Sequence, residues 1–256
     1  MNGLVGSFPS ELFLLTGLEE VSLRENRLDG SIPLWGLKEM TNLRKFALKH
    51  NDLTGTIPEE LYLLSDLEIL KIGRNFFNGT ISSGLSAMTS LTTYDIQDCQ
   101  LSGTVPEFVY TMTTLKKLDL SLNQMVGTLS TSIGQLTGLV NYAMSSNLLT
   151  GTLPTEVGLM TSLANIEVGT AGLGGIIPSE LGLLTRLTRL DVSESNFVGT
   201  VPQEIGLLTN IERLALNDNG FYGDISFMCD GFPRVKEFSA DLDMVNCTCC
   251  TCCGGS

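Results

Sequence analysis

The sequence predicts a right-handed solenoid of α/β repeats. Short parallel strands would stack into one concave sheet, and short helical or 3-10 segments would form the convex side. Three observations support this fold class: a Leu or Ile recurs 25 and then 24 residues apart, apolar residues follow it at fixed offsets, and a glycine stands twelve positions after it. A fixed period of roughly 20 to 50 residues is typical of repeat architectures. The opening residues are Leu18, Leu43, Leu67, Leu91, Leu115, Leu139, Leu163, Leu187 and Ile211.

Each repeat begins with a pattern typical of a half-buried strand. In the fifth complete repeat Leu115, Leu118 and Leu120 are apolar and end in alternation, which favours a strand with one buried face. Asn123 follows, and its side-chain amide can satisfy backbone groups where the chain leaves the strand. A glycine then permits a tight turn, and in most repeats a proline directs the chain to the opposite side. The segment after the proline, such as residues 178–185, has helical spacing.

The repeated unit Leu-x-x-Leu-x-Leu-x-x-Asn-x-Leu-x-Gly-x-Ile-Pro resembles leucine-rich repeats of the plant-specific type, and the resemblance covers residues 1 to about 246. In receptor-like kinases, receptor-like proteins and polygalacturonase inhibitors such repeats form extracellular recognition surfaces. The ending, residues 246–253, resembles the cysteine-rich tail of algal leucine-rich-repeat ectodomains. The resemblance implies a protein of the extracellular space or cell surface.

The repeat phase divides the chain into three parts. Residues 1–234 form the solenoid of about nine full repeats and a partial first one, residues 235–253 a final strand and cysteine-rich C-terminal cap, and residues 254–256 a short tail. A solenoid needs capped ends, whereas this chain starts inside a repeat at Asn2. We therefore expect a fragment of a longer protein, with targeting and anchoring segments elsewhere.

Seven cysteines fall into two groups. Cys99 occupies the asparagine position of its repeat, where we expect a buried structural thiol. The other six favour disulfides formed in an oxidising compartment, and zinc bound by the overlapping Cys-x-x-Cys motifs is the alternative. These disulfide candidates are Cys229, Cys247, Cys249, Cys250, Cys252 and Cys253. Asn-x-Thr motifs at Asn78 and Asn246 are candidate glycosylation sites.

The composition argues against several functions. With 15 basic and 28 acidic residues the chain carries a formal charge of −13, which disfavours nucleic acid and anionic membrane surfaces. No apolar run approaches the ~20 residues that span a bilayer, so this chain is not expected to insert directly into a membrane. The single histidine, His50, has no assignable nucleophile and orienting carboxylate, so we expect no catalysis, no metal site and no cofactor.

The outward positions of the strands are the candidate ligand surface. Basic residues dominate the early strands and acidic residues dominate from residue 93 onward, so the face is bipolar. Cross-strand pairs and solvation would explain the same charges without a ligand. We expect a protein, peptide or carbohydrate ligand with both charge signs, centred on residues 71 to 98. The candidate residues are Lys45, Lys49, His50, Lys71, Arg74, Asp95, Asp98 and Asp119.

A second surface offers a competing interpretation. One template position carries threonine in six repeats, and strands ~4.8 Å apart would arrange these side chains as a flat lattice suited to ice or a crystalline polysaccharide. Threonine also suits strands for structural reasons, and Ile176 and Val198 interrupt the array. The positions are Thr56, Thr80, Thr104, Thr128, Thr152 and Thr200.

The sequence thus favours a non-enzymatic extracellular recognition module of a receptor-like, membrane-tethered protein. A secreted inhibitor of cell-wall hydrolases is the alternative, and ice binding is a third possibility. One repeat is predicted to open most easily, because Ala171 replaces its asparagine and four glycines lie between residues 169 and 175.

Overall fold

The structure, a computed structural model, describes residues 3–228, 232–241 and 245–246. It divides into two compact units, Met1–Val126 and Gly127–Ser256. Both units are built in the same way, because each repeat contributes a strand to a main sheet, a second short strand, and a 3-10 segment. The predicted fold class, a solenoid of parallel strands with short 3-10 segments, is confirmed.

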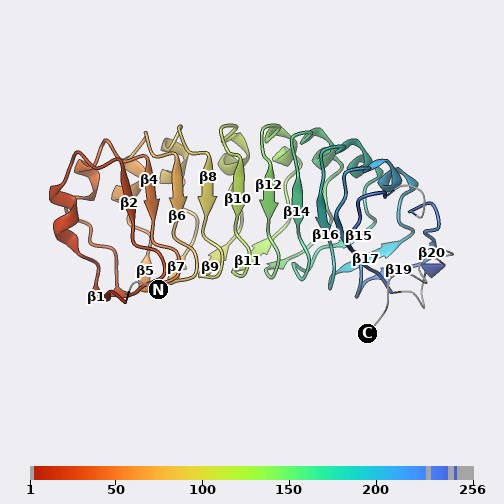
Figure 1. The fold of residues 1–256 in the computed structure, drawn as a ribbon, viewed down its shortest axis with the longest axis horizontal. Helices are drawn as coiled ribbons and strands as arrows, with labels where there is room; N and C mark the ends of the chain where they lie inside the picture. Colours follow the sequence, from red (N-terminus) through yellow and green to blue (C-terminus); the bar gives the residue numbers. More distant parts are fainter. Residues whose placement is uncertain (1–2, 229–231, 242–244, 247–256) are drawn as a thin grey trace. The chain divides into compact units, whose positions relative to one another are not determined.

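The first unit has two rows of parallel strands, which Figure 1 shows in colours from red through orange to green. Residues one repeat apart pair with each other, as Lys45, Ile69, Thr93 and Lys117 do in the main sheet. The main sheet contains β2 (Glu20–Ser22), β4 (Lys45–Ala47), β6 (Ile69–Lys71), β8 (Thr93–Asp95) and β10 (Lys117–Asp119). The second row contains β1 (Val5–Ser7), β3 (Arg27–Gly30), β5 (Asp52–Thr56), β7 (Phe76–Gly79), β9 (Gln100–Gly103) and β11 (Gln124–Gly127). The 3-10 segments are η1 (Ser10–Leu14), η2 (Leu37–Glu39), η3 (Glu59–Leu63), η4 (Ser83–Ala87) and η5 (Glu107–Thr111).

The second unit repeats this arrangement with shorter second strands. Its main strands are β12 (Asn141–Ala143), β14 (Asn165–Glu167), β16 (Arg189–Asp191), β18 (Arg213–Ala215) and β21 (Glu237–Ser239). The others are β13 (Leu148–Leu149), β15 (Gly174–Gly175), β17 (Asn196–Gly199), β19 (Gly220–Phe221), β20 (Gly223–Asp224) and β22 (Val245–Asn246). Its 3-10 segments are η6 (Thr131–Gln135), η7 (Thr155–Leu159), η8 (Ser179–Leu183) and η9 (Gln203–Leu207).

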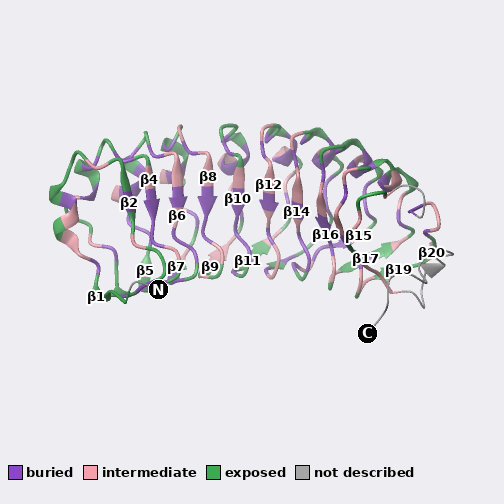
Figure 2. Ribbon diagram, in the orientation of Figure 1, coloured by how far each residue is buried: buried purple, intermediate pink, exposed green. Residues whose placement is uncertain are grey.

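The core lies between the strands and the 3-10 segments of each unit. The central residue of a main strand points inward, and Leu70, Tyr94 and Leu118 are at most 1% exposed. Figure 2 shows these strands buried at their centres. The alternating pattern therefore leaves the first and third residues of each strand on the outward face, where a ligand could reach them.

The segments opposite the main sheet form 3-10 turns because they are short and sharply bounded. Six of them follow directly after a proline, which fixes the entry of the chain. At the other end, the Leu64 N–H closes η3 with a bond of 3.2 Å to the Leu61 carbonyl. Within the described residues no helix combines the length and the apolar character that a membrane span requires.

The predicted asparagine ladder is present. The Asn75 amide nitrogen donates to the carbonyls of Leu48, Ile72 and Gly73, and its oxygen accepts from the Leu53 N–H at 3.0 Å. The side chain is buried, so these bonds satisfy backbone groups that water cannot reach. This interaction fixes the end of each main strand relative to the preceding repeat.

Three repeats lack the asparagine and carry Cys99, Ala171 or Ser195 at its position. At Ala171 the Leu149 N–H bonds to the Ala171 backbone carbonyl at 2.8 Å, so the carbonyl replaces the acceptor of the asparagine side chain. Alanine has no side-chain donor, so the amide donor of the asparagine is not replaced by the Ala171 side chain. Cys99 is half-buried rather than buried, and its thiol lies 3.9 Å from the Gln97 carbonyl. Burial raises the pKa of this thiol to about 11, despite hydrogen bonds from backbone groups of Asn75 and Phe77 that act in the opposite direction.

A left-handed residue follows every main strand from β2 to β18, a feature that the sequence pattern did not predict. These nine residues have φ between 49° and 67°, and they precede the asparagine position. The left-handed turn exposes the side chain beside the outward face of the sheet. The residues are Glu25, His50, Arg74, Asp98, Leu122, Ser146, Thr170, Glu194 and Asp218.

Candidate functional site

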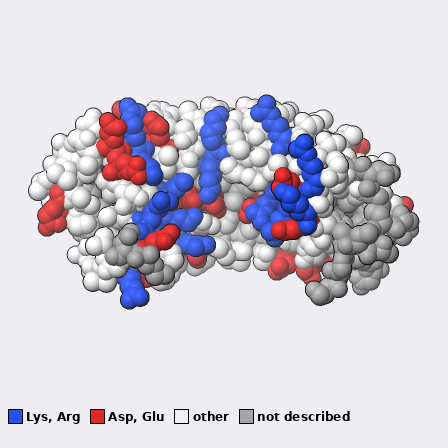
Figure 3. Space-filling model, viewed as in Figure 1, with Lys and Arg blue, Asp and Glu red and all other residues white. Residues whose placement is uncertain are grey.

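The outward face of the first unit contains a basic hollow of about 300 Å³. Figure 3 shows Lys and Arg gathered over the C-terminal ends of β4 to β8. Five cationic side chains and two carboxylates line the hollow, a formal excess of three positive charges in a chain whose net charge is −13. We call it the Lys71 hollow. Its lining residues are Arg24, Glu25, Lys49, His50, Lys71, Arg74, Asp95 and Lys117.

The strands of the main sheet carry one row of these groups, and the turns that follow the strands carry an adjoining row. Lys71 and Asp95 are the last residues of β6 and β8, and Lys117 is the first residue of β10. Lys49 lies in the turn after β4. The left-handed turns place His50 and Arg74 at the edge of the same hollow. The site is therefore made by the repeat geometry from residues of five successive repeats.

Asp95 is the buried anion of the site. Its side chain is 2% exposed, and its Oδ2 lies 3.1 Å from Lys49 Nζ and 2.9 Å from Lys117 Nζ. Burial would raise the pKa of Asp95, but the hydrogen bonds and charges of Lys117 and Lys49 outweigh it and hold the pKa below its usual value. The same contacts raise the pKa of Lys117 against the opposing effect of burial. Asp95 is thus a fixed internal counter-ion for two lysines.

Gly73 leaves the space through which Lys49 reaches Asp95. Lys49 and Asp95 belong to repeats that are not neighbours, and Gly73 occupies the position equivalent to Lys49 in the repeat between them. A Cβ atom at Gly73 would lie 2.5 Å from the Gln97 carbonyl oxygen and 3.2 Å from an Asp95 carboxylate oxygen. Any larger residue would displace the backbone or the carboxylate.

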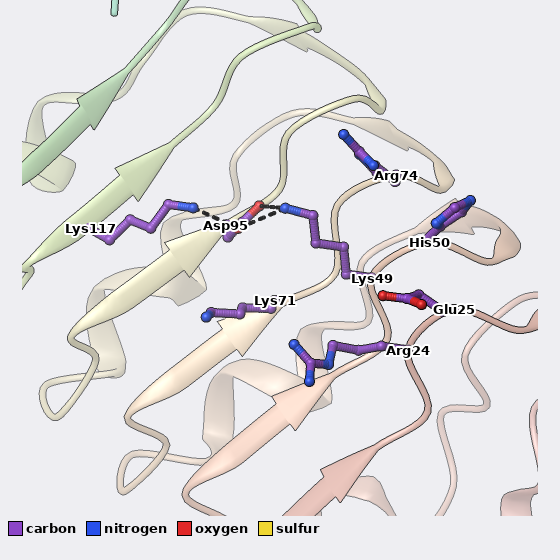
Figure 4. Close-up of a pocket in the computed structure, with 8 residues that line it drawn as sticks. All are labelled: Arg24, Glu25, Lys49, His50, Lys71, Arg74, Asp95 and Lys117. Atoms are coloured by element: carbon purple, nitrogen blue, oxygen red, sulfur yellow. Dashed lines mark hydrogen bonds and ion pairs between the residues drawn. The ribbon is translucent and has the colours of Figure 1, made fainter. Parts of the chain in front are cut away.

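Lys71 has no counter-ion of its own. Its amino group takes part in no ion pair or hydrogen bond with any residue that the structure describes, as Figure 4 illustrates. Burial lowers the pKa of Lys71, and the neighbouring charge of Lys117 lowers it further. Asp95 acts in the opposite direction, and Arg24 and Lys49 add smaller lowering contributions, so that the pKa stays below its usual value. The hollow therefore favours an additional negative group beside Lys71.

Two further cavities continue the hollow along the turns. Cavities of about 200 and 340 Å³ adjoin it, and His50 lines all three. The larger one contains Asp98 and the ring of Phe76, which is 49% exposed. A ligand that extends from the Lys71 hollow would meet an apolar ring and an acidic group there.

The predicted ligand-binding residues separate into two sets. Lys45 pairs with Glu20 at 2.6 Å, Asp119 pairs with Lys117 at 3.1 Å, and Asp95 holds two lysines. These charges are already compensated within the chain. His50, Arg74 and Asp98 are exposed, and Lys71 is half-buried without a partner among the described residues. Arg24 and Lys117 were missing from the predicted set. Both occupy repeat positions whose side chains lie on the outward face, and these positions could have identified them.

The outward face of the second unit carries paired charges. Arg189 bonds to Glu167 at 2.9 Å and Arg213 to Glu237 at 3.0 Å, each across neighbouring strands. Asp191, two residues after Arg189 on the same strand, accepts hydrogen bonds from the Ser193 N–H and hydroxyl. Solvation and cross-strand pairing account for these charges.

Comparisons with known proteins relate this geometry to receptor ectodomains. No protein-family model matches the sequence, and no curated protein matches it. Among solved structures, the plant peptide hormone receptor RGFR1 in complex with RGF2 superposes with a TM-score of 0.86 and 30% identity over 91% of this chain. The Arabidopsis receptor kinase HAESA in complex with the peptide hormone IDA and the co-receptor SERK1 gives 0.82 and 26% over 93%. A plant ice-binding protein gives 0.77 at 19% identity, over 96% of this chain and 81% of that one, which shows the fold alone.

The chain folds as a leucine-rich-repeat solenoid. Its repeats resemble those of the plant-specific type, and its structure is similar to the ectodomains of plant receptor kinases. The leucine-rich-repeat chain spans 37% of the RGFR1 chain and 44% of the HAESA chain.

The threonine array of the leucine-rich-repeat chain is exposed at all six positions. Glycines of the next repeat pack closely against two of these threonines: a Cβ at Gly103 would lie 3.0 Å from the Thr80 methyl, and a Cβ at Gly151 would lie 3.0 Å from the Thr128 methyl. Close packing of repeats thus places threonine beside glycine. These contacts give the array a structural reason that needs no ligand.

The two glycosylation candidates differ in what the structure describes. Asn78 is exposed on β7. The side chain of Asn246 and the six cysteines outside the repeats, Cys229 and those of residues 247–253, lie outside the described residues. The expected disulfides and the zinc alternative remain predictions, and the described residues hold no group of three or more potential metal ligands.

Proposed function

We propose that this chain is a non-enzymatic, extracellular recognition module that binds a peptide or protein ligand on the outward sheet face of its first unit. The observation that carries the proposal is the Lys71 hollow, an uncompensated basic site on an otherwise acidic chain. Local charge of one sign attracts and orients an oppositely charged ligand. Membrane tethering of the parent protein is part of the same proposal.

The structural neighbours support a peptide as the ligand class. RGFR1 and HAESA were each solved with a peptide, and HAESA also with a co-receptor. The resemblance covers more than nine tenths of this chain in both cases. A hydrolase inhibitor and an ice-binding surface have no comparable support from the residues described above.

The arrangement of the hollow and its extension suggests how a peptide would lie. An acidic group would bind beside Lys71 and Arg24, and an apolar side chain would pack on Phe76. A basic group would meet Asp98, the exposed member of the three predicted acids. Since Asp95 and Asp119 are paired internally, the acidic end of the site is narrower than the sequence indicated.

Selection from a displayed random-peptide library tests the proposal. The full chain should enrich peptides that carry an acidic group, and a variant with Lys71→Glu and Arg74→Glu should lose these peptides. The matched control is Arg189→Glu with Arg213→Glu in the second unit, which changes the same number of charges. Enrichment of the same peptides by both charge-reversed variants would place the ligand elsewhere.

A further inference from the structure

We infer that the Lys71 hollow binds a tetrahedral oxyanion carrying two negative charges, the chemistry of a phosphate monoester, rather than a carboxylate. The inference rests on the proposed function, because it names the group by which a peptide or protein ligand would enter this site. It concerns Lys71 and Arg24 as the contacting cations, and Lys49, Lys117 and Asp95 as their support.

The charge balance of the hollow favours a doubly charged group. Its lining has a formal excess of three positive charges after Asp95 and Glu25 are counted. Asp119, which pairs with Lys117 at 3.1 Å outside the lining, reduces this excess to two. A carboxylate would leave one positive charge uncompensated, whereas a phosphate monoester, with a charge of about −1.5 to −2 at pH 7, would leave at most about half a charge. Because Lys71 is half-buried, water screens its charge less than at an open surface.

The distribution of hydrogen-bond donors points to the same group. Lys49 and Lys117 already donate to Asp95, which fixes their amino groups at one side of the hollow. Lys71 and Arg24 line the same hollow and have no side-chain hydrogen bond to a described residue. An ammonium has three donors and a guanidinium five, so these two side chains offer more donors than two carboxylate oxygens can accept. Three terminal oxygens match them better.

The lysine arrangement is costly without a ligand. Lys71 is surrounded by Lys117, Arg24 and Lys49, with Asp95 as the opposing charge. Folding places these like charges together, and an incoming dianion relieves their repulsion. Charge repulsion that destabilises the free protein and is relieved by a ligand is expected at a binding site.

The test is calorimetric titration of the full chain with phenyl phosphate, phenyl sulfate and benzoate at pH 7.5 and low salt. These probes share a ring and differ in charge and number of oxygens. Phenyl phosphate should bind at least about tenfold more tightly than benzoate. The ratio of its affinity to that of phenyl sulfate should fall between pH 7.5 and pH 5, because only the phosphate loses a charge, at its second pKa of ~6, whereas any change in the charge of the lining acts on both probes.

Variants assign the effect to the hollow. Lys71→Met should reduce phenyl phosphate affinity about tenfold, Lys71→Arg should retain it within about threefold, and Arg24→Gln should give an intermediate loss. Lys38→Met on η2 is the matched control, because that lysine is exposed and does not line the hollow. Each variant is checked by its thermal transition, so that loss of binding is separated from loss of folding.

Three results would overturn the inference: equal binding of benzoate and phenyl phosphate, unchanged binding by Lys71→Met, or phenyl sulfate binding as tightly as phenyl phosphate, which would assign a singly charged group. Failure here and failure of the proposed function are distinguishable. If library peptides bind the hollow but phenyl phosphate binds no more tightly than benzoate, the proposed function stands and the inferred phosphate monoester is wrong. If phenyl phosphate binds the hollow more tightly than benzoate but no peptide binds there, the phosphate site stands and the proposed peptide recognition is wrong.

Discussion

Lys49 Nζ lies 3.1 Å from Asp95 Oδ2, although a complete repeat separates the two residues along the solenoid. The contact exists because Gly73, in the repeat between them, has no side chain to fill the path. Lys117 approaches the same carboxylate oxygen from the other side at 2.9 Å. One buried carboxylate therefore organises three repeats and leaves Lys71 as the uncompensated cation.

Removing the central charge should loosen the first unit. Asp95→Asn leaves Lys49 and Lys117 without their shared counter-ion, and we expect a loss of about 2 kcal/mol, between the values for exposed and fully buried pairs. Asp98→Asn is the control, because Asp98 is exposed in the following turn. Urea unfolding measures both, and equal midpoints for the two variants would contradict the role of Asp95.

The pH dependence of stability should report the same group. The pKa of Asp95 is lowered by folding, so its contribution is present above the unfolded value near ~3.9 and is lost as the pH falls through the folded value. The stability difference between the wild type and Asp95→Asn should be constant from about pH 5 to 9 and should shrink below about pH 4. A difference that persisted unchanged at pH 2 would mean that packing, not charge, dominates.

Gly73→Ala should be destabilising for steric reasons. The added methyl would lie 2.5 Å from the Gln97 carbonyl oxygen, which is closer than a carbon atom can approach. We expect a loss of about 2 kcal/mol or more, together with weaker phenyl phosphate binding. Gly17→Ala is the control, since nothing lies within 4 Å of a Cβ there. A Gly73→Ala protein as stable as Gly17→Ala would show that the backbone accommodates the methyl freely.

The asparagine ladder should contribute strongly at Asn75. Asn75→Ala leaves the buried Leu53 N–H and three carbonyls without this partner, which we expect to cost about 2 to 4 kcal/mol. Asn78→Ala, on the exposed side of β7, should cost less than about 0.5 kcal/mol. Thermal unfolding of both variants measures the difference, and a mild effect at Asn75 would show that water replaces the side chain.

The thiol of Cys99 should react slowly in the native chain. With a pKa of about 11, about one molecule in a thousand carries the thiolate at pH 8, and the thiolate is the reactive form. Brief treatment with iodoacetamide followed by peptide mapping should find Cys99 unmodified until denaturant is added. Rapid native alkylation would mean that this part of the repeat opens readily.

The repeats were predictable because the residue type at each template position has a local physical role. Leu70 is apolar because it points into the core, and Asn75 bonds to backbone groups at the end of its strand. The left-handed residues were not, because Glu25, His50 and Arg74 share no side-chain chemistry, and only the backbone at that position is common to them. The place of Asp95 on the outward face was predicted, but its contact with Lys49 was not. A count of outward charges cannot reveal that Gly73 lets Lys49 cross a repeat, since that contact depends on the space left by a missing side chain.

The central claim is that the Lys71 hollow recognises the ligand, and the most direct measurement is the affinity of a library-selected peptide for three chains. These are the wild type, Lys71→Glu with Arg74→Glu, and Arg189→Glu with Arg213→Glu. We predict that the first-unit variant loses at least about tenfold in affinity together with most of its salt dependence, while the second-unit variant binds like the wild type. Unchanged binding by the first-unit variant, with loss on replacing Thr104 and Thr128 by bulky residues, would contradict the account and place the site on the threonine array.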